Sequence, residues 1–213
     1  MLVSLLGTVL PRAAAPFFPG LLWRRRGVGR ALALTFDDGP DPETTPRLLD
    51  LLDAHGARAT FFCVGARARQ HPALVRAVRA AGHTVGQHTD THADPWRTPR
   101  ARLEAELERA TATLEDVLGE PVRWARPPYG HLSGPFLRWS RARGQAVAMW
   151  DAMPGDFLPT ATTDAVVRRV LRAARPGGVV VLHEGGRARA VTPMALETAL
   201  PHLAARGYGL TAL

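Results

Sequence analysis

The sequence predicts an α/β fold of repeated β/α units around a parallel sheet. Three observations support this prediction. Short apolar runs typical of buried strands alternate with longer segments of helical periodicity, and glycines lie near the ends of those segments. Strands that alternate with crossover helices pair in parallel, in either an open sheet or a closed barrel. In both arrangements functional groups gather at the carboxyl ends of the strands.

The composition is that of one soluble domain without a nucleic-acid partner. The chain has 213 residues, 46% hydrophobic and 22% charged, which is enough for one sizeable core. Its formal net charge of +8 rests on arginine alone, because lysine is absent, as are asparagine and isoleucine, a bias typical of GC-rich coding. The arginines are scattered without an aromatic-interleaved stripe, so we expect no nucleic-acid binding. The single Cys63 excludes an intramolecular disulfide.

Residues 1–30 form an apolar and basic extension, which we separate from a folded domain over residues 31–213. Leu2–Leu10 is apolar, but no positive charge precedes it, and three prolines interrupt any membrane-spanning helix. For residues 17–26 two interpretations stay open: contact with a membrane surface, or packing over one end of the domain. We expect the extension to be dispensable for folding, and a cell-envelope or membrane-associated location rather than a cytoplasmic one.

The expected strands are short runs rich in apolar or β-branched residues and bounded by glycine, proline or polar residues. In chain order they are Ala31–Phe36, Ala59–Val64, His83–Gln87, Val122–Ala125, Ala146–Trp150, Val179–Leu182 and Tyr208–Leu213.

The expected helices lie between these strands. The first begins at Thr44 or Thr45, which can cap it, has Pro46 in its first turn and ends near Gly56. Its leucines fall on one face, as an amphipathic helix requires. The further helices are Pro72–Ala81, Pro99–Leu118, Leu137–Arg143, Thr163–Ala174 and Pro193–Arg206.

Two adjacent carboxylates, Asp37 and Asp38, follow the first expected strand and precede the turn Gly39-Pro40. Successive side chains of a strand point to opposite faces, so one carboxylate can hold a metal ion while the other reaches a reacting group. The alternative is a solvated turn, since aspartate, glycine and proline cluster in turns of any globular protein. Residues at the other strand ends favour the functional interpretation.

The second signal is the pair His88 and His92, directly after the third expected strand. Two imidazoles four residues apart can bind one metal ion, and a third ligand must come from elsewhere in the chain. Asp38 is the natural candidate for that ligand. Position 89 is threonine, so the helical zinc-protease motif, which needs a glutamate beside the first histidine, is not met.

Three further strand ends carry groups that can react or orient a reacting group. Arg126 and Tyr129 follow the fourth expected strand, Trp150 and Asp156 lie at and after the end of the fifth, and His183 follows the sixth. Taken singly, such residues are explained as surface guanidiniums, turn carboxylates or strand-end histidines. Their repetition at successive strand ends indicates one composite site.

From Ala31 to the C-terminus the chain resembles the NodB-type polysaccharide deacetylases, or carbohydrate esterase family 4. Five motifs appear in the family's order: Thr35–Asp41, His88–His92, Arg126–Gly130, Trp150–Phe157 and Val179–Gly185. The resemblance implies a distorted (β/α)7 barrel rather than an open sheet. It also implies metal-dependent removal of an acyl group, most often N-acetyl, from an amino sugar in a glycan or lipid-linked saccharide.

The resemblance also implies the division of the chemistry. Asp38, His88 and His92 would hold one divalent metal ion, usually Zn²⁺, with Co²⁺ or Ni²⁺ as alternatives. Asp37 would be the general base, and His183 would be the general acid.

Further roles follow from the same motifs. Arg126 would orient the base and pair with Asp156, and Tyr129 would offer its backbone N–H to the oxyanion. Leu182 would line the pocket for the acyl methyl group. We expect Trp150, with Tyr129 and Leu182, to contact the substrate.

Some positions depart from the family's pattern. Gln87 stands where many members have asparagine, and Glu184 replaces a frequent aspartate. Met153 and Phe157 stand where the family has aspartate and tryptophan, which changes the wall near the site and leaves substrate preference open.

Two alternatives to an amino-sugar deacetylase stay open. One is an esterase that removes O-acetyl groups from a polysaccharide. The other is a catalytically silent glycan-binding domain, which would be expected to lack Asp37 or His183. Both residues are present, and this favours an enzyme.

Overall fold

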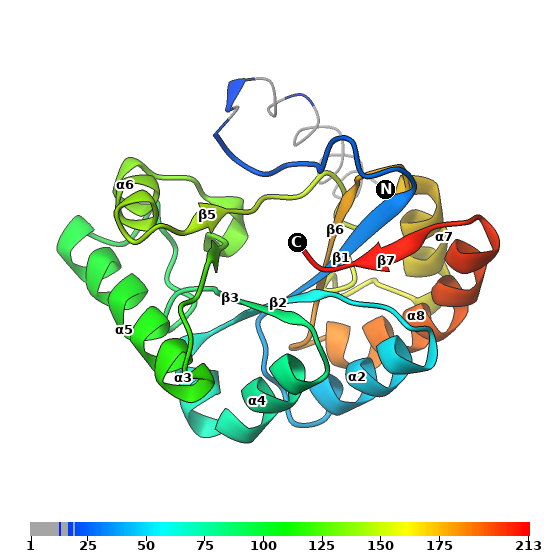
Figure 1. Cartoon of the computed structure of the whole chain (residues 1–213), viewed down its shortest axis with the longest axis horizontal. Helices are drawn as coiled ribbons and strands as arrows, with labels where there is room; N and C mark the ends of the chain where they lie inside the picture. The colour runs from blue at the N-terminus through cyan, green and yellow to red at the C-terminus, as the bar shows by residue number, and fades with distance from the viewer. Residues whose placement is uncertain (1–12, 14–16, 19) are drawn as a thin grey trace.

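The computed structural model describes residues 13, 17, 18 and 20–213, and a curled parallel sheet lies at its centre (Figure 1). The strand order is β5-β4-β3-β2-β1-β6, and β7 pairs with β1. The strands are β1 (Ala31–Asp37), β2 (Thr60–Cys63), β3 (Thr84–Gln87), β4 (Trp124–Ala125), β5 (Ala146–Val147), β6 (Val179–His183) and β7 (Gly209–Thr211).

Helices surround the outer face of the curl, as Figure 1 shows. One helix connects each pair of successive strands, except that two helices, α3 and α4, lie between β2 and β3. They are α2 (Thr44–Ala54), α3 (Gly65–Gln70), α4 (Pro72–Ala80), α5 (Arg100–Leu118), α6 (Gly134–Ala142), α7 (Thr163–Ala173) and α8 (Ala188–Ala205), with a short 3-10 turn, η2 (Pro128–Gly130), after β4.

Strand β1 organises the sheet. It pairs with β6 along most of its length, so that Asp37 lies opposite His183 in the register. On its other side the amino-terminal half pairs with β7 and the carboxyl-terminal half with β2. The end of β1 that carries the two carboxylates is therefore held on both sides by hydrogen-bonded strands.

The sheet does not close between β5 and β6 in the described part of the chain, and the amino-terminal segment crosses this opening (Figure 1). Leu22 forms a bridge with Ala148 next to β5, and Arg24 forms one with Gly178 next to β6. The side chain of Trp23 between them is buried in the core. The predicted distorted barrel is thus completed by residues outside the seven strands.

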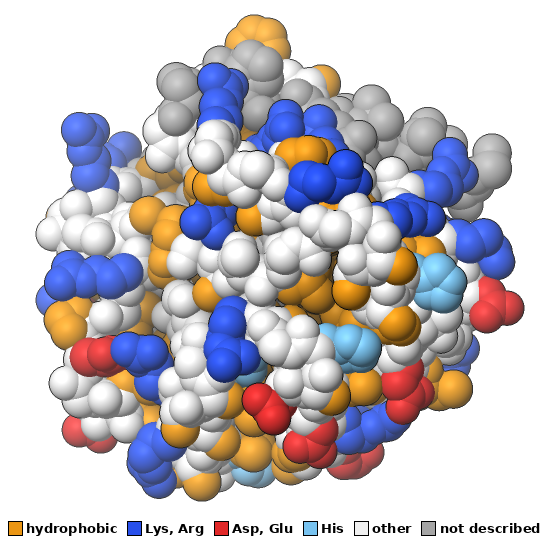
Figure 2. Space-filling view, turned by 45° about the vertical axis from the view of Figure 1, so that its right-hand side comes forward, with side chains coloured by type: hydrophobic (Ala, Val, Ile, Leu, Met, Phe, Trp, Pro, Cys, Tyr) orange, Lys and Arg blue, Asp and Glu red, His pale blue; other side chains and the backbone are white. Residues whose placement is uncertain are grey.

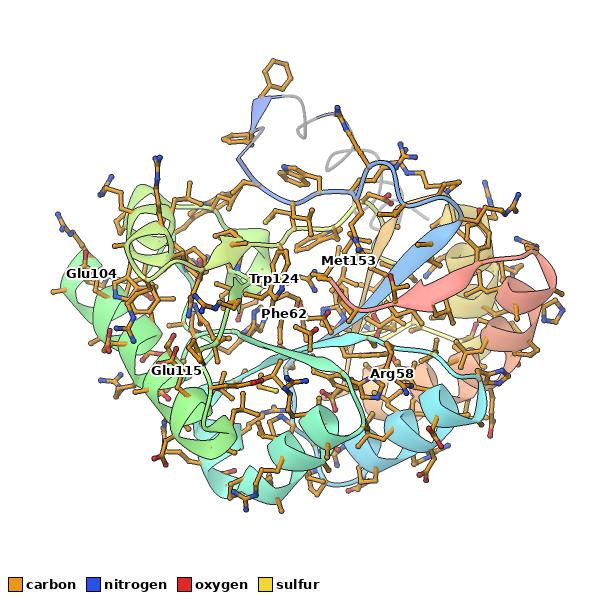
Figure 3. All side chains as sticks on the ribbon, in the orientation of Figure 1. Arg58, Phe62, Glu104, Glu115, Trp124 and Met153 are labelled. Carbon is orange, nitrogen blue, oxygen red and sulfur yellow. The ribbon has the colours of Figure 1, made fainter. Side chains whose placement is uncertain are left out.

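Alternation along the strands divides the core into two layers. Leu32, Leu34 and Phe36 of β1 pack outward in the cluster beneath the helices, whereas Ala33 belongs to the cluster inside the curl. Figure 3 labels Phe62 near the middle of the curl, where its ring lies 4.1 Å from the guanidinium carbon of Arg126. The inner layer therefore combines apolar packing with a buried charge.

The predicted strands and helices all appear, but β4 and β5 contain two residues each where four and five were predicted, and three helices differ from expectation. Helix α3 was not expected, because its sequence Gly-Ala-Arg-Ala-Arg-Gln has no apolar periodicity. Helix α6 begins three residues early, where Ser133 accepts a hydrogen bond from the N–H of Phe136 and caps the helix. Helix α8 begins five residues before Pro193, which lies inside it rather than in its first turn.

The structure also changes the interpretation of the extension. The segment contains three consecutive arginines, Arg24–Arg26. Arg24 donates to the carbonyl of Pro176, and Arg25 donates to that of Ala212, so two of these three bind the domain itself. With Trp23 in the core, these contacts argue against our expectation that residues 1–28 are dispensable for folding. Packing over the domain accounts for Leu21–Arg25, while membrane contact stays a prediction for the exposed Phe17 and Phe18.

No helix in the described part of the chain is long and apolar enough to cross a membrane. On the face shown in Figure 2, arginine side chains are spread widely and mixed with acidic side chains in the lower half. That distribution agrees with the scattered arginines of the sequence, and the absence of a nucleic-acid partner stays a prediction.

Candidate active site

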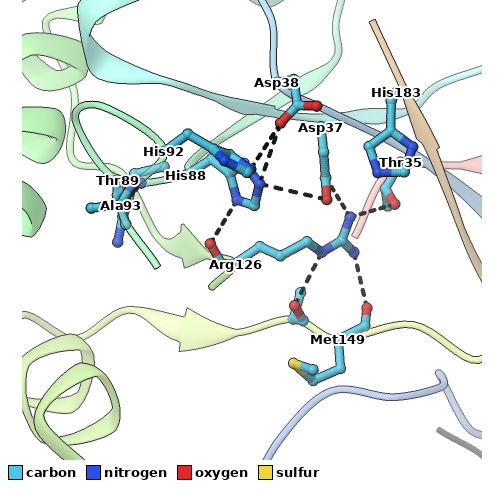
Figure 4. A network of polar contacts seen from close by, with 12 residues as sticks. Thr35, Asp37, Asp38, His88, Thr89, His92, Ala93, Arg126, Met149 and His183 are labelled. Carbon is cyan, nitrogen blue, oxygen red and sulfur yellow. Dashed lines mark hydrogen bonds and ion pairs between the residues drawn. The ribbon is translucent and has the colours of Figure 1, made fainter. Parts of the chain in front are cut away.

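The loops after β1, β3, β4 and β6 meet at the carboxyl end of the sheet and bring the predicted residues together (Figure 4). Four residues other than glycine in the described chain have a positive φ: Asp38 at 73°, Thr89 at 60°, His92 at 58° and Tyr129 at 58°. All four lie in these loops. Such conformations cost free energy and concentrate at functional sites, so the local backbone itself marks this end of the barrel.

Asp37 is buried and fixed by one strong interaction. Its Oδ1 accepts a hydrogen bond of 2.7 Å from Arg126, whose same nitrogen also donates to the hydroxyl of Thr35 at 2.7 Å. Its Oδ2 lies 3.9 Å from Nε2 of His88. One carboxylate oxygen is therefore held by arginine, and the other faces the histidine cluster.

Arg126 is fully buried, and its guanidinium is bonded on every side. Besides Asp37 and Thr35, it donates to the carbonyls of Ala148 at 3.1 Å and Met149 at 2.9 Å. A buried charge is stable only when it is paired and hydrogen-bonded in this way. The network holds Asp37 in one orientation, as the family resemblance implied, and adds Thr35, which alternation places on the same face of β1.

Asp38, His88 and His92 form a cluster with the geometry of a metal site. Oδ1 of Asp38 lies 3.1 Å from Nε2 of His92 and 3.7 Å from Nε2 of His88, and ligand atoms of the three residues lie within 4.8 Å of one another. Zinc binds such nitrogen and oxygen atoms at about 2.0–2.2 Å, which separates two ligand atoms of one ion by about 3–4 Å. Oδ1 of Asp38 is buried and has no hydrogen-bond partner among the described residues, as expected for an atom that binds a cation.

His88 is prepared to act as a metal ligand. Its Nδ1 lies 2.7 Å from the carbonyl oxygen of Arg126, which can only accept, so Nδ1 carries the proton and Nε2 presents its lone pair to the cluster. Burial lowers the pKa of His88 to about 4, although the Asp37 carboxylate acts in the opposite direction. The ring is therefore neutral at pH 7, the form that binds a metal ion.

The pKa of Asp38 also suits a ligand. Burial acts to raise it, but the neighbouring His92, His88 and His183 outweigh that effect and hold the pKa well below its ordinary value. The carboxylate is therefore charged throughout the neutral range.

Side chains outside the cluster support the loop that carries both histidines. Gln87 accepts a 2.8 Å hydrogen bond from the N–H of Thr89, and the hydroxyl of Thr89 accepts one of 3.0 Å from Ala93. Asp90 accepts from Arg69 at 2.6 Å on the outer side of the loop. Gln87, which departs from the family's asparagine, thus retains a structural role.

His183 is oriented by Asp156, and this corrects our prediction that Asp156 pairs with Arg126. Oδ1 of Asp156 accepts from Nδ1 of His183 at 2.9 Å, while Oδ2 accepts from the His183 N–H and from the Thr192 hydroxyl, each at 2.7 Å. The sequence could not distinguish the two partners, because the choice depends on the path of the loop before α7. Two separate networks result, one for Asp37 and one for His183.

The Asp156 carboxylate also sets the charge of His183. Burial acts to lower the pKa of His183, but Asp156, aided by Asp37 and Asp38, raises it to about 9. With Nδ1 bonded to Asp156, the imidazolium presents its Nε2 proton to the site. The residue is therefore protonated at neutral pH, as a general acid must be.

Glu184 lies beneath the turn that carries Asp38. It is fully buried, its Oε2 accepts from the hydroxyl of Thr45, and a Cβ on Gly39 would collide with its carboxyl group. Burial raises the pKa of Glu184 to about 8, so it is neutral at pH 7. Only glycine fits at position 39, a packing constraint that no sequence pattern indicated.

Tyr129 is exposed beside His92, whereas Trp150 is buried with its ring 5.9 Å from the guanidinium carbon of Arg126. The two residues before Tyr129 are prolines without an N–H, so its own N–H is the first backbone donor after Arg126. Its ring contacts that of His92 edge to face, with centroids 4.7 Å apart. The indole of Trp150 is largely buried, and Gly130 leaves room for it because a Cβ there would collide with the ring.

Leu182 does not line the pocket, contrary to the sequence prediction. It is fully buried in the outer cluster with Phe36, beneath the helices. Side chains two apart on a strand share a face, so the neighbour on the same side as His183 is Val181, which belongs to the inner cluster with Trp150. Strict use of this alternation would have identified Val181 from the sequence.

Comparisons with known proteins agree with this fold. The family described as polysaccharide deacetylase matches residues 24–148. A peptidoglycan-N-acetylglucosamine deacetylase of Bacillus cereus is 34% identical over 188 residues, 87% of this chain and 87% of that protein. A chitooligosaccharide deacetylase of Sinorhizobium fredii is 37% identical over 201 residues, 89% of this chain and 93% of that protein. A crystal structure of a peptidoglycan N-acetylglucosamine deacetylase matches with a TM-score of 0.87 at 27% identity and covers 94% of each chain.

Proposed function

The chain belongs to the polysaccharide deacetylase family, and we propose that it removes the N-acetyl group from amino sugars of a glycan, with Asp38, His88 and His92 holding a divalent metal ion. One observation carries the proposal. Asp37 and His183 lie opposite each other on adjacent strands, each oriented by its own buried partner, beside a three-ligand cluster. This arrangement supplies a base and an acid to one reacting centre.

Asp37 acts as the base. Arg126 occupies its Oδ1, which leaves Oδ2, on the side of His88, to accept a proton from the attacking water. General-base assistance of this kind contributes about 10²–10⁴ to the rate. When bound, a divalent ion polarises the acyl carbonyl and lowers the pKa of water.

The backbone N–H of Tyr129 donates to the carbonyl oxygen as it becomes negative. One such donor contributes about 3–4 kcal/mol to the transition state. His183 then gives its Nε2 proton to the departing nitrogen, because an amide nitrogen leaves readily only as the neutral amine. Because the pKa of His183 is raised to about 9, this residue still holds its proton at the neutral pH at which Asp37 takes a proton from water.

Zn²⁺ is the ion we propose for the cluster, because two imidazoles and one carboxylate with open positions are a typical ligand set for catalytic zinc. The same nitrogen and oxygen atoms also bind Co²⁺ and Ni²⁺. Metal analysis of the purified protein, compared with His88→Ala and His92→Ala, tests the assignment. A double mutant that kept its full metal content would contradict it.

Removal of an O-acetyl group from a polysaccharide is the competing reaction. A protonated His183 favours an N-acetyl substrate over an O-acetyl substrate. The departing nitrogen of an amide depends more strongly on receiving a proton than the departing oxygen of a sugar ester does. The experiment compares acetate release from chitin oligosaccharides, peptidoglycan fragments, lipid-linked amino sugars and acetylated xylan by the zinc-loaded protein. Release from amino sugars alone supports the proposal, and release from xylan alone would replace it with the esterase.

A catalytically silent glycan-binding domain is the remaining alternative. Such a domain would bind the same oligosaccharides without releasing acetate. Binding without turnover by a protein that contains one metal ion per chain would therefore favour it.

A further inference from the structure

A row of aromatic rings leads from the metal cluster to the surface of the protein. The ring of His92 contacts Tyr129 with centroids 4.7 Å apart, and Tyr129 lies 5.5 Å from His131. His131 in turn is stacked on Trp96, with centroids 3.8 Å apart and ring planes only 4° from parallel. Trp96 belongs to the loop that carries both metal-binding histidines, and His131 follows Tyr129 after η2.

Trp96 is exposed yet held in place. Its side chain is 66% exposed, but its indole N–H donates to the carbonyl of Leu132 at 2.7 Å. Its backbone N–H donates to Oδ1 of Asp94 at 2.9 Å, and the same oxygen lies 2.8 Å from Nδ1 of His131. Asp94 therefore ties the two members of the stack together.

An exposed tryptophan of this kind differs from a scattered surface residue, which needs no functional explanation. Here one ring face is covered by His131 and the indole N–H is satisfied, so the exposed area lies on a flat apolar face of fixed orientation. Because the ring is already immobilised, a ligand that covers this face loses little further side-chain entropy on binding.

The chemistry of the row identifies the ligand. A pyranose ring has an apolar face of C–H groups and a rim of hydroxyls, which suits a flat indole bordered by the polar atoms of Asp94 and His131. The row begins at a metal ligand, so a saccharide whose acetamido group reaches the metal cluster can extend along it. We propose that Trp96, stacked on His131, forms a subsite for a sugar unit beyond the one that is deacetylated, an inference that rests on the function proposed above.

Trp96→Ala tests the subsite with two substrates of different length. For chitohexaose we expect the KM for acetate release to rise about five- to tenfold with little change in kcat, because tens of square ångströms of apolar contact are lost. For the shortest oligomer that the wild type deacetylates, we expect no change. Trp96→Phe retains an aromatic face and should recover most of the affinity. Phe17→Ala removes another exposed aromatic residue, from the amino-terminal segment outside this row, and should change neither substrate.

Direct binding separates this inference from the proposed function. Chitohexaose is added to the zinc-loaded wild type and to Trp96→Ala while tryptophan fluorescence is recorded. A saturable change in the wild type that moves to higher chitohexaose concentration in the variant, where the remaining tryptophans report binding, supports the subsite, whether or not acetate is released. If the wild type releases acetate but both proteins show the same KM for chitohexaose and the same fluorescence titration, the subsite is wrong and the proposed function stands. Fluorescence binding that needs Trp96, without acetate release from any amino sugar, would retain the subsite and overturn the proposed function.

Discussion

Asp156→Asn tests whether Asp156 keeps on His183 the proton that the proposed reaction needs. The carboxylate accepts three hydrogen bonds, from the N–H and Nδ1 of His183 and from the hydroxyl of Thr192. Asparagine retains the size and one acceptor oxygen but removes the negative charge. In the variant, burial still acts to lower the pKa of His183, but the carboxylate that mainly raises this pKa is gone, so the pKa should fall.

The expected magnitude follows from the protonated fraction of the acid. A group with a pKa of about 9 is roughly 90% protonated at pH 8, whereas one at the ordinary value of about 6.5 is roughly 3% protonated. If the substitution returns His183 toward its ordinary pKa, kcat/KM at pH 8 should fall about 30-fold. The deficit should become small near pH 6, where both imidazoles hold the proton.

The assay measures acetate release from about pH 5.5 to pH 9.5, together with metal content. The alkaline limb of the pH profile should move to lower pH in Asp156→Asn, while the bound metal stays unchanged. Thr192→Val is the matched control, because it removes one hydrogen bond to the same carboxylate without altering charge. An alkaline limb that stays in place in Asp156→Asn would refute the role of Asp156 in holding this proton.

Three further predictions concern the buried surroundings of the site. Glu184, with its pKa raised to about 8 by burial, binds a proton that the unfolded chain releases near pH 4.5, so metal-free protein should lose stability as pH rises through 8. Urea unfolding at about pH 6 and pH 9 should show a smaller loss in Glu184→Gln, and identical losses would count against the buried carboxyl. Leu182→Ala should cost about 2–5 kcal/mol of stability without changing the preference for acetyl over formyl groups. A shift in acyl preference in steady-state assays would show that Leu182 lines the acyl pocket after all. Trp23→Ala should cost about 3–5 kcal/mol, since its indole packs inside the curl. An unchanged denaturation midpoint would show that the segment across the open side contributes little.

Much of the fold could be predicted from the sequence, because it depends on local patterns. Apolar runs and helical periodicity place seven strands and most helices, and the barrel follows from five motifs in order. Helix α3 escaped prediction because an alternation of alanine and arginine has no apolar face. The burial of Trp23 was not predicted for a different reason: its partners in the core lie far along the chain, beside β5 and β6.

The candidate site shows the same division between local and distant information. Asp37 and Asp38 are neighbours in sequence, and His88 and His92 share one loop, so their grouping could be expected from adjacency and spacing. The partner of Asp156 could not be expected from the sequence, because a buried carboxylate can accept hydrogen bonds from either an arginine or a histidine. Only the path of the loop before α7 brings Asp156 next to His183.

The proposed division of labour between Asp37 and Asp38 is tested most directly by making the same change at each. Metal content and turnover are measured for Asp37→Asn and Asp38→Asn across a zinc titration. Asp37→Asn should retain the metal and lose about 10²–10⁴ in turnover at every zinc concentration, because its amide cannot accept a proton. Asp38→Asn should bind zinc more weakly, since an amide oxygen is an uncharged ligand, and should regain part of its turnover as zinc is added. Wild-type deacetylation by Asp37→Asn, or full metal binding by Asp38→Asn, would contradict the roles proposed for these two carboxylates.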